Sequence, residues 1–177
     1  MAAADCFRVF MTKNTPEKIN ARVKELFGYI GEALWCIQGL EELLAKYYVV
    51  SCTLAGDENA EDIDAQFEGH FCHTLGQMVR IFKADSNPDA AISQRLDDFA
   101  NERNWLVHRL RRQDYHKLME GDKFPQLVLR VKSLVQEAEA IIELFNSMMI
   151  DHFVALGCER DFITQAVEQE HRIIMKT

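Results

Sequence analysis

Residues 127–152 read LVLRVKSLVQEAEAIIELFNSMMIDH, and this stretch decides the fold class. Its inward-facing positions alternate steps of four and three residues, the spacing that lines side chains along one face of an α-helix. The repeat is carried by Leu127, Val131, Leu134, Ala138, Ile141, Phe145, Met148 and His152. Such a heptad seam predicts a long helix that packs along a neighbouring helix or across a dimer.

The same period is present near the beginning of the chain. Thr15-Pro16-Glu17 is typical of a helix start, because a capping hydroxyl precedes a proline at the first helical position. An apolar stripe with steps of three and four follows from Ile19 to Tyr47. Within this long first helix, Gly28 and Gly31 indicate a bend or a close contact with another helix.

Further helices are expected over residues 61–83, 88–112 and 159–174, with a connector through Gly121, Asp122 and Pro125 before the helix that carries the seam. The helix over 88–112 has a predicted inner face of Leu96, Phe99, Leu106 and Leu110. Only 3 Pro and 8 Gly interrupt the 177 residues, and no apolar run has the two-residue period of a strand. The sequence therefore predicts an all-α protein, an antiparallel bundle of about five helices forming a single domain over residues 1–177.

Cysteine usage and hydropathy indicate the compartment. The five cysteines are odd in number, scattered and free of any C-x-x-C pair, so a reducing cytoplasm is expected rather than a secreted disulfide framework. Residues 1–14 contain Asp5 and no long apolar core, unlike a signal peptide. The longest apolar stretch, residues 140–156, is interrupted by Glu143, Asn146 and Asp151, so no membrane span is expected.

Charge is unevenly distributed along the chain. The net charge of −8 argues against general coating of nucleic acid, which normally comes with a basic surface. From Arg103 to Lys117, however, five cations and one anion, Asp114, give a local +4, which leaves −12 for the remainder. A basic island in an acidic chain predicts a local anion site.

Within this island the residues Arg103-Asn104-Trp105-Leu106-Val107-His108 form a pattern of Arg-Asn, three residues and His. In an all-α domain of this size, the pattern resembles the HEPN superfamily, whose hallmark is an Arg, four to six residues and a His, often with a polar residue after the Arg. The resemblance covers the helical layout loosely and only these six residues specifically. Arg111 to His116 has the same Arg-to-His spacing but no Asn after the Arg, so the first match is preferred.

The resemblance implies a metal-independent endoribonuclease that acts as a homodimer and needs no cofactor. Many members are toxins or defence effectors restrained by an antitoxin-type protein partner, and others have lost catalysis and only bind. One large toxin branch carries a Tyr two residues after the His, where its antitoxin modifies it. Leu110 stands at that position here, so tyrosine modification is not expected.

The residue types fit cleavage of RNA through its own 2′-hydroxyl. Histidine exchanges protons near neutrality and can act as base or acid, and arginine meets phosphate oxygens with a fixed fork of donors. Arg103, Asn104 and His108 are therefore the candidate catalytic residues. The candidate substrate-binding residues are Arg109, Arg111 and Arg112, which would steer RNA phosphate. A solvated helix end, where cations suit the helix dipole, explains these three arginines equally well.

The spacing within the motif raises a geometric question. Asn104 and His108 are four residues apart and share a helix face, whereas Arg103 and His108 are five apart and lie about 140° from each other on an ideal helix. Their side chains can converge only through the length of Arg, a distorted helix end or a second subunit. A homodimer would bring two copies of the motif together.

Two other interpretations remain open. Arg103 and His108 can be ordinary groups of a half-exposed helix that pair with Glu102 or Asp98, and the chain can be a noncatalytic helical module that binds protein through its seam and acidic surface. A metal site is not expected. His70 and His73 have a spacing compatible with one ion, but no second ligand pair is evident.

Overall fold

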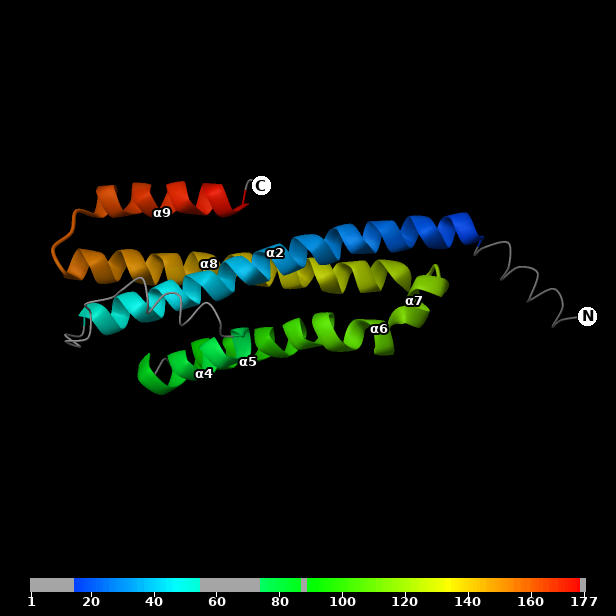
Figure 1. Cartoon of the computed structure of the whole chain (residues 1–177), viewed down its shortest axis with the longest axis horizontal. Helices are drawn as coiled ribbons and strands as arrows, with labels where there is room; N and C mark the ends of the chain where they lie inside the picture. The colour runs from blue at the N-terminus through cyan, green and yellow to red at the C-terminus, as the bar shows by residue number, and fades with distance from the viewer. Residues whose placement is uncertain (1–14, 55–73, 87–88, 176–177) are drawn as a thin grey trace, which may run out of the picture. The chain divides into compact units, whose positions relative to one another are not determined.

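The computed structural model describes residues 15–54, 74–86 and 89–175, and within these ranges all regular structure is helical. The elements are α2 (Pro16–Leu54), α4 (Leu75–Ser86), α5 (Ala90–Asn104), the π-helical turn η2 (Trp105–Arg109), α6 (Leu110–Gln113), α7 (Tyr115–Met119), α8 (Phe124–Ala155) and α9 (Arg160–Met175) (Figure 1). The all-α prediction is confirmed. None of the helices in the described ranges is long and apolar enough to cross a membrane.

The chain divides into two compact units. Unit one contains residues up to 35 together with 101–136, and unit two contains residues 36–100 and 137–177. Three helices, α2, α5 and α8, contribute residues to both units. The expectation of a single domain stays a prediction.

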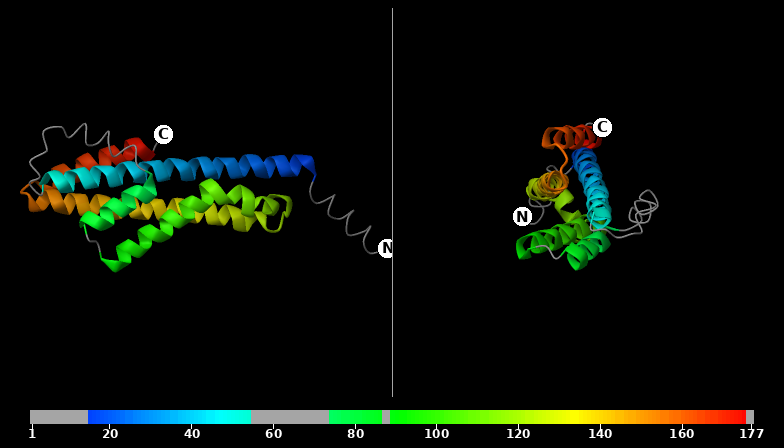
Figure 2. Two further views of the ribbon diagram at one scale, coloured as in Figure 1. Left: turned by 60° about the horizontal axis from the view of Figure 1, so that its bottom comes forward. Right: turned by 90° about the vertical axis from the view of Figure 1, so that its left-hand side faces the viewer.

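In unit one, the first halves of α2 and α8 run in the same direction. A Cβ added at Gly121, just before α8, would lie within 3.2 Å of the Arg22 guanidinium, and Lys132 Nζ lies 4.4 Å from the centre of the Tyr29 ring. The two helices therefore run parallel over these residues, as can be followed in Figure 2. An antiparallel bundle in which the chain reverses twice between two helices sets those two helices parallel, so this pair is consistent with the expected arrangement.

Residues 101–119, which we call the motif arm, run against α8 in the opposite direction. Arg130 of α8 contacts Glu102 near the start of the arm, and Lys123 just before α8 contacts Glu120 just after the arm. The arm and α8 are thus joined as a helical hairpin through a short connection. The antiparallel prediction holds here because the sequence places a turn between the two segments.

Unit two is organised around three aromatic rings. The ring centroids of Tyr47, Phe82 and Phe145 lie 5.2–5.8 Å apart, each pair with its edge toward a face. Ion pairs join α4 to α5 through Lys83 and Asp97, and α5 to α8 through Arg95 and Glu137.

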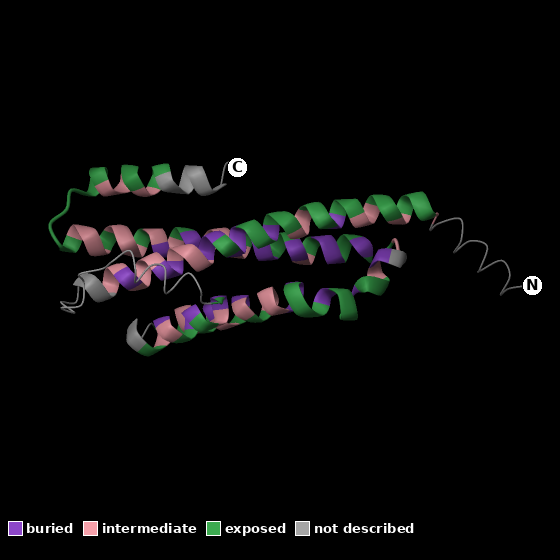
Figure 3. Cartoon of the chain, viewed as in Figure 1, coloured by how far each residue is buried: buried purple, intermediate pink, exposed green. Residues whose placement is uncertain are grey.

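The heptad seam of α8 is buried within the chain. Its residues from Leu127 to Phe145 are buried in their respective units, and Met148 and His152 are half-buried (Figure 3). The predicted inner face of the third helix is buried as well, namely Leu96, Phe99, Leu106 and Leu110. The seam therefore packs along neighbouring helices of the same chain, the first of the two uses that its pattern predicts.

The long first helix begins at Pro16, as predicted, and continues without interruption for 39 residues. Thr15 Oγ1 accepts a hydrogen bond from the backbone N–H of Lys18 at 3.4 Å, the expected capping contact. A Cβ at Gly28 or Gly31 would meet no atom of the described structure within 4 Å. The two glycines therefore mark no close contact with another helix of the described ranges.

Candidate functional site

A π-helical turn interrupts the motif arm at the predicted motif. The backbone N–H of Leu110 donates to the carbonyl of Trp105, five residues earlier, and the turn covers Trp105 to Arg109. Turns of this kind are rare inside α-helices and are frequent at functional sites. Of the three ways in which Arg103 and His108 could converge, a distorted helix is present, inside the predicted helix rather than at its end.

The π turn changes the angular relation between Arg103 and His108. An α-helix closes its hydrogen bond over four residues, whereas this turn closes over five and so contains an extra residue. Residues five apart consequently come nearer to one face than the roughly 140° of an ideal helix. The local backbone therefore favours a common orientation of these two positions.

The candidate catalytic residues differ in their surroundings. Arg103 and Asn104 are half-buried and in contact, because Arg103 Nη1 donates to Asn104 Oδ1 in a long hydrogen bond of 3.4 Å. His108 is exposed, and its side chain makes no hydrogen bond or ion pair with any residue that the structure describes. The structure thus joins Arg103 to Asn104 and presents His108 to solvent.

The candidate substrate-binding residues lie on the exterior of the arm. Arg109, Arg111 and Arg112 are exposed, and none of them forms an ion pair within the described part of the chain. Their guanidinium groups are therefore available to an external anion.

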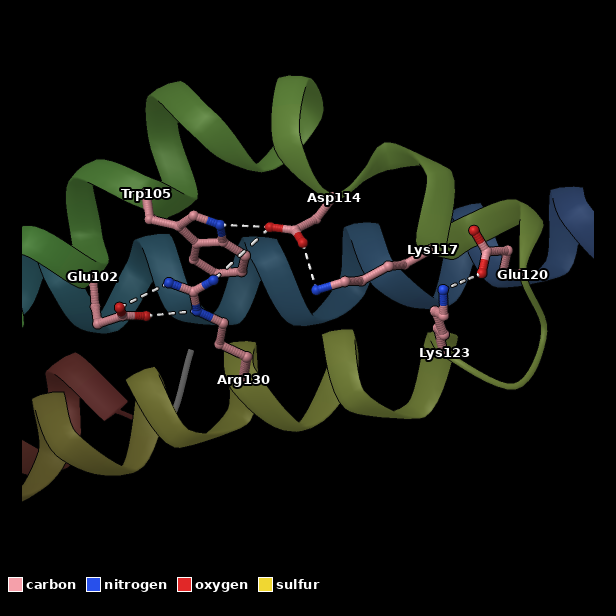
Figure 4. A network of polar contacts seen from close by, with 7 residues as sticks. All are labelled: Glu102, Trp105, Asp114, Lys117, Glu120, Lys123 and Arg130. Carbon is pink, nitrogen blue, oxygen red and sulfur yellow. Dashed lines mark hydrogen bonds and ion pairs between the residues drawn. The ribbon is translucent and has the colours of Figure 1, made fainter.

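The single anion of the basic island, Asp114, is turned inward. It is buried, and its carboxylate accepts from Trp105 Nε1 at 2.7 Å and from Lys117 Nζ at 2.5 Å, with Arg130 Nη1 at 3.8 Å (Figure 4). The other carboxylate of the arm, Glu102, is held by Arg130. Both acidic groups of the arm are thus neutralised internally, and the outer surface carries unopposed positive charge.

The surroundings of Asp114 control its ionisation. Burial acts to raise the pKa of this carboxyl, but hydrogen bonds from Lys117 and Trp105, with the charges of Lys117 and Arg130, outweigh it and hold the pKa below its ordinary value. The carboxylate is therefore ionised and stabilises the folded arm at neutral pH.

Acid should remove this stabilisation. A lowered folded-state pKa gives a contribution that is complete above the ordinary Asp value of about 4 and is lost as the pH falls through the lower folded value. Asp114→Asn should reduce the free energy of unfolding at pH 7 by about 1.5–3 kcal/mol, the usual range for hydrogen bonds to a charged group. Urea denaturation from pH 7 to pH 2 should show the difference between wild type and variant shrinking in acid. A difference that stays constant over this range would contradict the assignment.

The interpretation of Arg103 and His108 as ordinary groups of a half-exposed helix predicted particular ion pairs. It expected Glu102 or Asp98 to pair with Arg103 or His108. Instead Glu102 receives both hydrogen bonds of the Arg130 fork at 2.8 Å, and Asp98 accepts from Gln94 Nε2 at 2.9 Å. His108 therefore makes neither of these pairings within the described residues, and the pairing of Arg103 stays a prediction.

Sequence reasoning missed the network of Trp105, Asp114, Lys117 and Arg130. Trp105 and Asp114 are nine residues apart, a separation that places two side chains on opposite faces of a straight α-helix. Arg130 comes from another helix. The only sequence feature beside it is the seam residue Val131, which predicts a buried helix face and no polar network. No local pattern could have found this network, because it depends on the π turn and on the return of the chain through α8.

Other parts of the chain offer weaker sites. A groove between α8 and α9 is lined by Glu143, Asn146, Ser147, Ile150, Arg160, Thr164, Val167 and Glu168. Its single cation, Arg160, is paired with Asp151 at 2.7 Å, so the groove offers no unpaired positive charge to an anionic ligand. His70 and His73 lie outside the described residues. Within the described residues, no group of three His, Cys, Asp or Glu side chains is placed to hold a metal ion.

Comparison with other proteins adds no relative. No model of a protein family, no curated protein and no solved structure matches the chain. The functional assignment therefore depends on the residues of the motif arm.

Proposed function

We propose that the chain is a HEPN-like, metal-independent endoribonuclease that cleaves RNA by attack of the RNA's own 2′-hydroxyl. The observation that supports this most directly is the π-helical turn over Trp105–Arg109, which begins inside the Arg-Asn-x3-His motif and includes its His108. A distortion at this place has a chemical use, since it turns the Arg and His positions toward one face. Single π turns inside α-helices occur frequently at functional sites.

His108 acts in this proposal as the group that exchanges protons with the substrate. Its exposed imidazole can reach a bound ribose, and general acid–base catalysis by histidine typically contributes about 10²–10⁴-fold in rate. Arg103 stabilises negative charge on the phosphorane, for which a permanently charged guanidinium is suited. Asn104 orients Arg103 through the contact between their side chains.

The outer arginines supply the affinity for RNA. Arg109, Arg111 and Arg112 are exposed and unopposed, and contacts to phosphate release counterions, so binding should weaken steeply as salt increases. The acidic remainder of the chain repels RNA elsewhere. Binding is therefore confined to the motif arm.

The experiment that tests the function is an RNA cleavage assay with purified protein in EDTA. Because the attacking group is the 2′-hydroxyl, the products should carry 2′,3′-cyclic phosphate ends, and a 2′-deoxy substitution at the cleaved position should block the reaction. Dependence of cleavage on added divalent metal, or products with 5′-phosphate ends, would exclude the mechanism.

We further propose that the active form is a homodimer. Arg103 of one subunit can serve His108 of the other, and a two-fold contact would bring the two motifs together. By the same resemblance, an antitoxin-type protein partner would restrain the enzyme in a toxin or defence role.

A second candidate function is a noncatalytic module that associates through α2. The seam of α8 is occupied inside the chain, but the outer face of α2 exposes Phe27, Leu34 and Trp35 beside Gly28 and Gly31. Paired antiparallel about Gly31, two copies would set Leu34 of one against Gly28 of the other, with Phe27 beside this contact. Light scattering on Phe27→Lys distinguishes a dimer contact through α2 from one through the motif arm. Loss of the dimer in this variant would place the contact on α2.

A further inference from the structure

One guanidinium, that of Arg130, contacts three separate residues of the motif arm (Figure 4). Its Nε and Nη2 donate to the two carboxylate oxygens of Glu102, both at 2.8 Å. Its central carbon lies 3.6 Å from the centre of the Trp105 ring. Its Nη1 lies 3.8 Å from Asp114 Oδ2. Every nitrogen and one face of the group are therefore engaged with the arm.

These contacts require the arm to depart from a straight helix. Glu102 and Asp114 are twelve residues apart, which is about 18 Å along the axis of an ideal α-helix. A single guanidinium nevertheless meets both carboxylates, and Trp105 is hydrogen-bonded to Asp114 directly. The chain between them contains the π turn and ends at Asp114, where φ is −118° and ψ is 0°. The bent path of the arm and the position of Arg130 are thus geometrically linked.

We propose that Arg130 is a positioning residue that holds the π-helical turn in place and thereby fixes the orientation of His108. The guanidinium ties the residue before the motif, Glu102, to the first residue of the turn, Trp105, and to Asp114 beyond it. Both properties used are specific to arginine, namely the two parallel hydrogen bonds and stacking on an indole. Lysine would keep the charge and lose the fork.

The chain contains a matched control for this contact. Arg95 and Glu137 form a second arginine–glutamate fork between α5 and α8, with Nε–Oε1 at 2.5 Å and Nη2–Oε2 at 3.3 Å. The side chains of this pair are 36% and 40% exposed, against 39% and 43% for Arg130 and Glu102. The two forks are therefore comparable in exposure, but Arg95 makes no hydrogen bond or ion pair with the motif arm in the described structure.

The first test measures the π turn itself by native-state amide exchange, followed by NMR in Arg130→Met and Arg95→Met. The reporter is the Leu110 amide, which donates the hydrogen bond that closes the turn, and the Leu134 amide in α8 serves as reference. In Arg130→Met, exchange at Leu110 should accelerate about tenfold or more relative to the reference, because a fork to a charged group is lost. Arg95→Met should leave the ratio unchanged, and Arg130→Lys should fall between wild type and Arg130→Met. An unchanged ratio in Arg130→Met, or an equal change in Arg95→Met, would overturn the proposal.

The second test concerns catalysis and rests on the proposed ribonuclease function. In Arg130→Met, kcat should fall at least tenfold with KM nearly unchanged, because Arg109, Arg111 and Arg112 still bind phosphate. A loosened π turn with wild-type kcat would overturn the positioning role. If the wild-type protein cleaves no RNA, the ribonuclease proposal fails alone, and the exchange measurement still decides whether Arg130 holds the turn.

Discussion

His108→Ala should lower RNA cleavage by about 10²–10⁴-fold, whereas His116→Ala should leave it within a few-fold of wild type. Both histidines are exposed, and both follow an arginine by five positions, so the two substitutions are matched in chemistry and exposure. The two histidines differ in the backbone structure that contains them. His108 lies in the π turn, and His116 lies in α7, beyond the break in the helix at Asp114.

Activity should be measured as kcat/KM on one RNA substrate in EDTA, and folding should be checked by the free energy of unfolding in urea. Neither substitution removes buried surface, so both variants should unfold within about 0.5 kcal/mol of wild type. Equal loss of activity in the two variants would indicate a general loss of RNA binding. Loss in His116→Ala alone would move the site to the second Arg-to-His pattern.

Mixing inactive Arg103→Ala with inactive His108→Ala should restore roughly a quarter of wild-type activity. If the arginine of one subunit serves the histidine of the other, each mixed dimer keeps one intact pair and loses the other. In an equal mixture, half of the dimers contain one subunit of each variant. Each of these dimers has one intact site and one inactive site. The recovered activity is therefore large compared with the background of either variant alone.

The mixture should be incubated under conditions in which subunit exchange has been verified with labelled protein, and then assayed at the same total concentration as wild type. His108→Ala mixed with wild type serves as control for dilution. Full exchange without recovery would show that each site takes its Arg103 and His108 from one subunit, an arrangement that the π turn also accommodates. A monomer by light scattering at micromolar concentration would exclude the shared site altogether.

Local patterns in the sequence predict most of the helices. The start of α2 at Pro16 follows from a capping hydroxyl and a proline, and the buried face of α8 follows from alternating steps of four and three residues. Such features depend on residues within a few positions of each other, so they can be read before the fold is known. The candidate residues Arg103, Asn104 and His108 were found in the same way.

Helix direction could not be predicted in this way. An amphipathic stripe shows which face of a helix is buried and says nothing about the direction of its neighbour. The parallel course of α2 and α8 in unit one depends on how many times the chain reverses between them, a property of the connections rather than of either helix. The expected all-α class was therefore correct, whereas the relative direction of this pair followed only from the connections.

The sequence by itself determined that the chain is helical, which faces are apolar, and that a basic segment contains an Arg-Asn-x3-His pattern. Only the tertiary structure decided that this segment would bend through a π turn, that Asp114 would be buried, and that Arg130 would hold Glu102, Trp105 and Asp114 together. The physical reason is that helical periodicity is a local property of backbone hydrogen bonding. A π turn gives up regular α-helical bonds, and contacts from a distant helix, here Arg130 of α8, stabilise that departure.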